Sequence, residues 1–206
     1  MKIISTSDVA DESLEQFRDQ LRGDLDVDLA DGKVALLSLE PPSWVSLLAE
    51  TERWQQGLAA AAALYVAELL KEGAKETWRS RSKAIAALAG STNRLAKLAA
   101  SVVRLKQAGR ADTSISISLP EPDAFFAAKL PLSASDFELT QLELALFVHH
   151  LSAISRLIET HRAEQTRPLT GYFLSLLTNG DLQVSWFEGQ SLEPSVVLLP
   201  FSNDAV

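Results

Sequence analysis

Apolar and polar residues repeat with two different periods along the chain, and these periods predict strands and helices. Alternating or short apolar runs bounded by turn residues predict strands at 2–5, 24–29, 34–39, 113–119, 172–177, 182–187 and 196–201. Apolar residues three and four positions apart predict helices at 8–22, at a segment beginning at Trp44 and including Leu48, within 53–108, at 124–130 and at 136–165. The pairs Asp31-Gly32 and Asn179-Gly180 are typical of tight hairpin turns.

The stretch 53–108 has the strongest helical pattern. It is rich in Ala, Leu, Glu, Lys and Arg, which are good helix formers, and it contains no proline. Gly73 and Gly90 are the expected breaks, so the last helix of the stretch should cover about 93–108. The uncharged run 58–67 has ten residues, half of the roughly 20 that a membrane-spanning helix needs. We therefore expect a buried helix and no membrane span.

These elements together predict an α+β fold. We expect a mixed or mostly antiparallel sheet of about five to six strands, whose apolar face is covered by long helices. A length of 206 residues fits a single domain covering 1–206. Similar segments at 38–42 and 118–122 each end a predicted strand before a predicted aromatic-bearing helix. An internal duplication is therefore an alternative organisation, with copies at about 33–110 and 113–165 and a C-terminal hairpin region at 170–201.

Charge is strongly segregated along the chain. Residues 71–110 carry 10 Lys and Arg against 2 Asp and Glu, whereas 1–70 carry 5 against 13 and 111–206 carry 4 against 12. This asymmetry indicates a charged partner for the basic segment, which is either an acidic part of the same chain, another protein or a nucleic acid. The formal net charge of −8 favours the first two, because duplex-binding domains are usually basic overall.

Six basic residues are the candidates for an anion-binding or partner-binding surface. They are Arg79, Arg81, Lys83, Arg94, Lys97 and Arg104. The last three fall, together with Ser101, on one side of the predicted helix 93–108. A solvated basic face above a buried apolar face explains the same spacing, so both interpretations stay open.

One short motif indicates chemistry. The segment RLIETH, residues 156–161, places Arg156 and His161 in an R-x4-H arrangement. This spacing is similar to that of the HEPN ribonuclease family, in which an Arg and a His from paired helices cooperate in RNA cleavage. The resemblance implies Arg156 and His161 as catalytic residues. It covers six residues, and Leu157 stands where family members commonly carry a polar residue. A surface Arg and His flanking an apolar helix face is the alternative.

The sequence indicates no other chemistry. Cysteine is absent, the spacing of the three histidines along one predicted helix does not allow them to share a metal ion, and no nucleotide-binding or nucleophile motif is present. We therefore expect no metal and no cofactor. The N-terminal segment lacks the apolar core of a signal peptide, so a cytoplasmic location is expected.

The functional expectation is a non-enzymatic interaction or accessory protein of bacterial type. It would bind a protein partner, or a second copy of itself, through charge-segregated surfaces. One alternative is a protein that acts on RNA or another nucleic acid through the basic helices at 71–110. Another is an enzyme or small-ligand binder whose site the sequence does not reveal.

Overall fold

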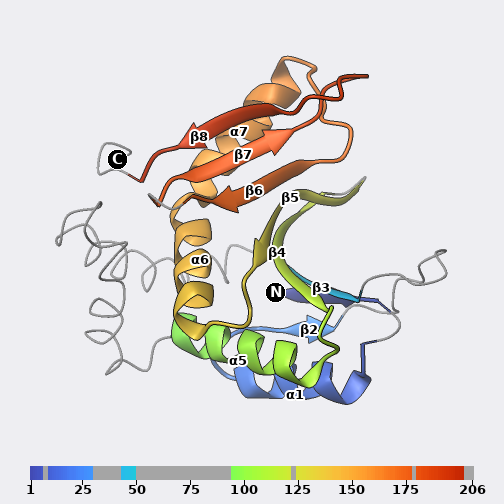
Figure 1. The fold of residues 1–206 in the computed structure, drawn as a ribbon, viewed down its shortest axis with the longest axis vertical. Helices are drawn as coiled ribbons and strands as arrows, with labels where there is room; N and C mark the ends of the chain where they lie inside the picture. The colour runs from blue at the N-terminus through green and yellow to red at the C-terminus, as the bar shows by residue number, and fades with distance from the viewer. Residues whose placement is uncertain (7–8, 30–42, 50–93, 122–123, 178–179, 202–206) are drawn as a thin grey trace.

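The computed structural model describes residues 1–6, 9–29, 43–49, 94–121, 124–177 and 180–201 of the chain (Figure 1). These residues form four helices and one sheet of eight strands. The strands are β1 (Lys2–Ser5), β2 (Asp28–Leu29), β3 (Trp44–Leu48), β4 (Ser114–Glu121), β5 (Ala124–Leu132), β6 (Tyr172–Leu176), β7 (Leu182–Trp186) and β8 (Ser195–Leu199). The helices are α1 (Asp11–Leu21), α5 (Arg94–Ala108), α6 (Phe137–His149) and α7 (Leu151–Ala163).

The strands lie in the order β2-β1-β3-β4-β5-β6-β7-β8. The pairs β1–β2, β3–β4 and β5–β6 are parallel, and the connection between the members of each pair contains helix α1, helix α5 or the helices α6 and α7, respectively. The other neighbouring pairs are antiparallel. Parallel neighbours need such crossover connections, whereas antiparallel neighbours can be joined by a short turn. The predicted α+β class and mixed sheet are confirmed.

The core lies between the sheet and the helices. Ile3, Leu47, Ile117 and Leu130 are cross-strand neighbours on β1, β3, β4 and β5, and all four are buried. They belong to one cluster with the inward residues of the helices, such as Phe17 of α1 and Leu98 of α5. In Figure 1, α1 and α5 lie below the β1–β3 end of the sheet, α7 lies behind β6–β8, and α6 stands between them. The expectation that helices cover the apolar face of the sheet is confirmed.

The predicted number of strands, about five to six, was too low. Two of the eight strands, β3 and β5, occupy segments that were predicted to be helical, the segment from Trp44 and the segment 124–130. Each has a neighbouring strand on both sides, and these neighbours supply partners for its backbone N–H and C=O groups. Pro131 of β5 lies beyond the two residues of this strand that pair with β6. Sheet context therefore overrides the local helix preference.

The predicted helix at 136–165 is not continuous. It ends as α6 at His149, and α7 begins at Leu151 after His150, whose φ of −84° and ψ of 1° leave the helical region. The helices predicted at 8–22 and 93–108 are present as α1 and α5. Among the described helices α5 is the longest, with 15 residues, so the long helices of the prediction are not found in this part of the chain.

Some predictions concern residues outside the described part of the chain. The return strand at 34–39 and the helical stretch at 53–93 lie there, and so does most of the first copy of the proposed duplication. The predicted strand at 24–29 is reduced to the two residues of β2, because the chain turns directly after α1. Within the described residues, no helix is both long enough and apolar enough to cross a membrane.

Candidate functional site

Helix α5 carries three of the six residues of the predicted basic surface. Arg94 and Arg104 are exposed, but Ser101, which lies between them in the predicted stripe, is buried. Lys97 donates from its Nζ to Asp24 Oδ2 at 2.6 Å, and Asp24 follows α1. The structure therefore brings an acidic N-terminal residue onto the basic helix. Arg79, Arg81 and Lys83 lie outside the described residues.

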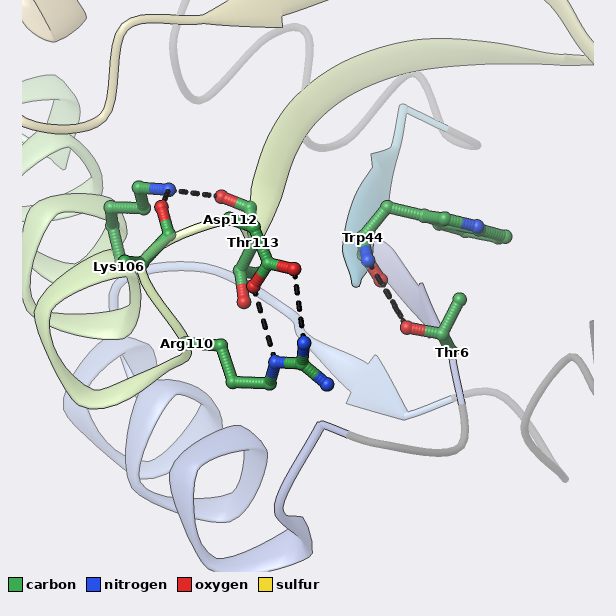
Figure 2. A network of polar contacts seen from close by, with 7 residues as sticks. Thr6, Trp44, Lys106, Arg110, Asp112 and Thr113 are labelled. Atoms are coloured by element: carbon green, nitrogen blue, oxygen red, sulfur yellow. Dashed lines mark hydrogen bonds and ion pairs between the residues drawn. The ribbon is translucent and has the colours of Figure 1, made fainter. Parts of the chain in front are cut away.

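The other basic residues at the end of α5 contact the chain itself (Figure 2). Lys106 donates to the backbone carbonyl of Ala111 at 2.7 Å and to that of Thr113. Arg110 forms two hydrogen bonds with the carboxylate of Asp112, at 3.1 and 3.2 Å. These contacts fix the turn between α5 and β4. Much of the described basic charge is thus used within the fold.

Arg156 and His161 do not form one site within the chain. They are five residues apart on α7, which corresponds to about 140° around the helix at 100° per residue. Arg156 is exposed, whereas the half-buried His161 bonds through Nδ1 to the hydroxyl of Tyr172 at 3.0 Å. The R-x4-H arrangement stays a prediction that requires a second chain to bring an Arg and a His together.

His161 belongs to a group of aromatic side chains between α7 and the sheet. Its ring centroid lies 4.6 Å from that of Trp186, and the Tyr172 ring lies 5.6 Å from Trp186. Trp186 donates from Nε1 to Glu188 Oε1 at 2.6 Å. Burial raises the pKa of Tyr172, and the carboxylates of Glu188 and Glu121 raise it further, against the opposing effect of Arg162. Tyr172 thus remains a neutral donor or acceptor that links α7 to β6.

A cleft of about 500 Å³ opens next to this group. Its floor is mostly apolar and includes Phe126, Ala127 and Ile158, while Arg162 and Glu121 form an ion pair that joins α7 to β4 at its wall. A larger hollow of about 660 Å³ lies at the end of α1, but it is lined by charges of both signs, including Arg18, Arg22, Asp24, Asp26 and Asp28. The cleft beside α7 has the mixture of apolar floor and few polar groups that small-molecule sites show.

Gly171 shapes the wall of this cleft. Its φ is +82°, and a Cβ at this position would lie 2.8 Å from the carbonyl oxygen of Phe126 and 3.1 Å from that of Ala127. Only glycine allows both this dihedral angle and this close approach to β5 without strain. The turn before β6 is therefore held directly against the β5 backbone.

Two buried titratable groups belong to α6, Glu143 in the middle of the helix and His150 at its C-cap. Glu143 accepts hydrogen bonds from the Ser133 backbone at 2.7 Å and from its hydroxyl at 2.6 Å, and burial raises the Glu143 pKa. His150 is buried, and its Nε2 has no hydrogen-bond partner among the residues that the structure describes. Burial, with a smaller effect of the neighbouring His149, lowers the pKa of His150 to about 4. Glu143 thus ties the middle of α6 to Ser133 in the segment before the helix, and His150 lies where α6 ends and α7 begins.

The outer strand β8 is the most apolar exposed element of the described sheet. Val196 and Leu198 are 49% and 51% exposed, and they alternate with Val197 and Leu199, which pack against the core. β8 pairs with β7 on one side and is the last strand in the order. No charged residue lies between Ser195 and Leu199. The sequence predicts this strand, but no local pattern indicates that it is the last strand of the described sheet.

No protein-family model, no curated protein and no solved structure matches the chain. Within the described residues, no group of three or more His, Cys, Asp or Glu side chains is placed to hold a metal ion. Function is therefore argued from the geometry of the described surfaces.

Proposed function

We propose that this protein is a non-enzymatic interaction protein that assembles with a second copy of itself through strand β8. The observation that carries the proposal is the exposed, uncharged outer edge of β8. The expected partner class, a protein or a second copy of this chain, is retained from the sequence, but the surface is the sheet edge and not the basic helix.

An outer strand presents unpaired backbone N–H and C=O groups along one side. Proteins usually protect such edges with charged side chains, prolines or bulges, because an unprotected apolar edge pairs with another strand. β8 has no charged side chain, and two of its five side chains, Val196 and Leu198, are exposed. Its prolines, Pro194 and Pro200, stand outside the strand and leave its five residues open to pairing.

The sequence of this edge is self-complementary. Pro194 and Pro200 are equally far from Val197, so an antiparallel pair of β8 strands centred on Val197 would end at a proline in both directions. Since proline has no N–H, the ladder would stop there. In this register Val196 of each copy faces Leu198 of the other, and both are exposed apolar residues. Two-fold symmetry requires such a self-complementary patch.

The contacts of α5 support a partner surface away from the basic segment. Lys97, Lys106 and Arg110 all bond within the chain. Arg94 and Arg104 are exposed and make no ion pair with a described residue, and this favours the second candidate, a nucleic acid bound along α5. The two candidates predict different species in solution.

Light scattering on gel filtration, with absorbance at 260 and 280 nm, tests the proposal on the full chain. The wild type should elute as a dimer without nucleic acid. The double variants Val196→Lys/Leu198→Lys and Val196→Glu/Leu198→Glu should each be monomeric, because like charges would face each other across the two-fold axis. An equimolar mixture of the two variants should recover a dimer.

Ser175→Lys is the matched control, because Ser175 is exposed on the same face but on β6, two strands from the edge. It should leave the dimer intact. A monomeric wild type at about 100 μM, a range in which specific complexes are formed, would overturn the proposal. A dimer that persists in both charged variants would place the interface elsewhere. Nucleic acid that elutes with the protein at low salt only would support the second candidate.

A further inference from the structure

One cross-strand row lies on the face of the sheet opposite Leu47, Ile117 and Leu130, and we call it the Lys129 row. It consists of Leu48, Ser118, Lys129, Phe173, Ser185 and Val196, one residue from each strand from β3 to β8. Exposure changes along the row. Ser118 is fully buried, Lys129 and Phe173 are partly buried, and Val196 is half exposed. Lys129 stands where this face passes from buried to open.

The ammonium group of Lys129 lies between two aromatic rings. Its Nζ is 5.9 Å from the centroid of the Trp44 ring and 5.5 Å from that of Phe126. Both distances lie within the range of about 6 Å over which the face of an aromatic ring attracts a cation. The rings come from β3 and β5, so two strands that are not neighbours contribute the walls.

The backbone of Trp44 and the ring of Phe126 each contact another part of the fold. The backbone N–H of Trp44 donates to Thr6 Oγ1 at 3.1 Å, and Figure 2 shows the Trp44 indole pointing away from α1 and α5. Phe126 meets Phe173 edge to face, with the centroids 5.7 Å apart. The Phe126 ring is therefore ordered by Phe173 independently of a ligand, and such preorganisation reduces the entropy lost on binding.

Lys129 has no counter-ion in the described part of the chain. None of the ion pairs or hydrogen bonds of the described residues involves its Nζ, and burial is the only cause that lowers its pKa. An ammonium group has three donors, and rings satisfy them poorly compared with oxygen acceptors. Partial burial of an unpaired charge is unfavourable, so an external anion would gain from this position.

The site points to a ligand with a single negative charge. Lys2 is on the same face, but it lies on β1, three strands from β5, or about 14 Å at 4.8 Å per strand. The single ammonium group can bind one carboxylate, and the two rings can pack against a planar apolar group attached to it. A phosphate dianion would usually require more than one cation.

We propose that Lys129 binds the carboxylate of a small organic acid, whose planar apolar group packs against the rings of Trp44 and Phe126. The carboxylate accepts hydrogen bonds from Nζ, and the open side of the row, toward Phe173, admits the ligand. This site lies on β5 and not on the β8 edge, so it and the dimer proposal stand or fall separately.

Calorimetric titration of the full chain tests the site with indole-3-acetate as the probe and neutral indole-3-acetamide as its matched control. The wild type should bind the carboxylate at least about tenfold more tightly than the amide, the range expected for a charge-assisted hydrogen bond. Lys129→Met should remove this difference and Lys129→Arg should retain most of it. Lys97→Met, at a lysine already paired with Asp24, should change nothing.

A second measurement does not depend on any variant. Acetylation of surface amines, followed by mass spectrometry, should be slowed by indole-3-acetate at Lys129 and not at Lys97. Equal binding of acid and amide, no binding of either at millimolar concentration, or unchanged acetylation of Lys129 would overturn the proposal. In that case the lysine would serve only to pack its stem and charge against the two rings.

Discussion

Replacement of Gly171 by alanine should separate a steric contact from a purely conformational cost. Gly171 and Gly189 are two of the described glycines with a positive φ, at +82° and +55°. A Cβ at Gly189 would meet no atom within 4 Å, whereas a Cβ at Gly171 would lie 2.8 Å from the carbonyl oxygen of Phe126. Gly189→Ala is therefore the matched control, because it changes the backbone preference without a collision.

The expected magnitudes follow from these contacts. Alanine in the left-handed region costs about 1–2 kcal/mol relative to glycine. Alanine also reduces the conformational entropy of the unfolded chain, which offsets about 0.4–1 kcal/mol of this cost. Gly189→Ala should therefore lower the free energy of unfolding by about 1 kcal/mol. At Gly171 the methyl group also forces the turn away from β5, and such overpacking costs about 1–3 kcal/mol. Gly171→Ala should therefore destabilise by about 2–4 kcal/mol.

Urea and thermal unfolding of the full chain would measure both variants. For a chain of this size each kcal/mol lowers Tm by about 2–4 °C, so Gly171→Ala should lose about 5–15 °C and Gly189→Ala about 2–4 °C. Equal losses in the two variants would show that the approach of Gly171 to the carbonyls of Phe126 and Ala127 has no energetic consequence. The packing of the cleft wall would then have to be reconsidered.

Two further predictions concern buried polar groups. Because the pKa of His150 is lowered from 6.5 to about 4, the unfolded chain binds a proton that the folded chain does not, so stability should fall as the pH drops from about 6.5 to about 4. The loss approaches about 3 kcal/mol, and urea unfolding of His150→Leu at pH 5 and pH 8 should show a weaker acid dependence than the wild type. Tyr172→Phe removes the 3.0 Å bond to His161 and should cost about 0.5–1.5 kcal/mol at neutral pH while the ring contacts remain. A Tyr172→Phe variant as stable as the wild type would show that this bond makes no net contribution.

Sequence patterns predicted the elements whose signals are local. Asn179-Gly180 between two apolar runs predicted the hairpin of β6 and β7, and the alternation in TSISISL predicted β4. The segment 124–130 failed because its Ala and Lys residues favour a helix in isolation. Its strand conformation depends on β4 and β6, and only the folded chain brings these to its two sides. Tertiary context decided the structure of that segment.

The candidate sites depended on the same long-range pairing. The residues around Lys129 in the sequence predicted a helix there. Only the pairing of Lys129 with Ser118 on β4 shows which cross-strand row Lys129 belongs to. The group of His161, Tyr172 and Trp186 forms because the β5–β6 crossover lays α7 against β6 and β7. The sequence pattern could have predicted that Tyr172 and Trp186 are buried, because both fall on the inward side of the alternation in their strands. No pattern in the sequence predicted that their rings would contact His161.

The segregation of charge along the sequence does not carry over directly to the surface. Helix α5 packs beside α1, so Lys97 of the basic segment meets Asp24 of the acidic one. Such exposed pairs contribute at most about 1 kcal/mol, and their main effect is to neutralise charge that a partner would otherwise recognise. The edge of β8 has no corresponding internal partner among the described residues, because no strand follows it in the sheet order. The β8 proposal therefore predicts that variants at Val196 and Leu198 change assembly more than variants at Lys97.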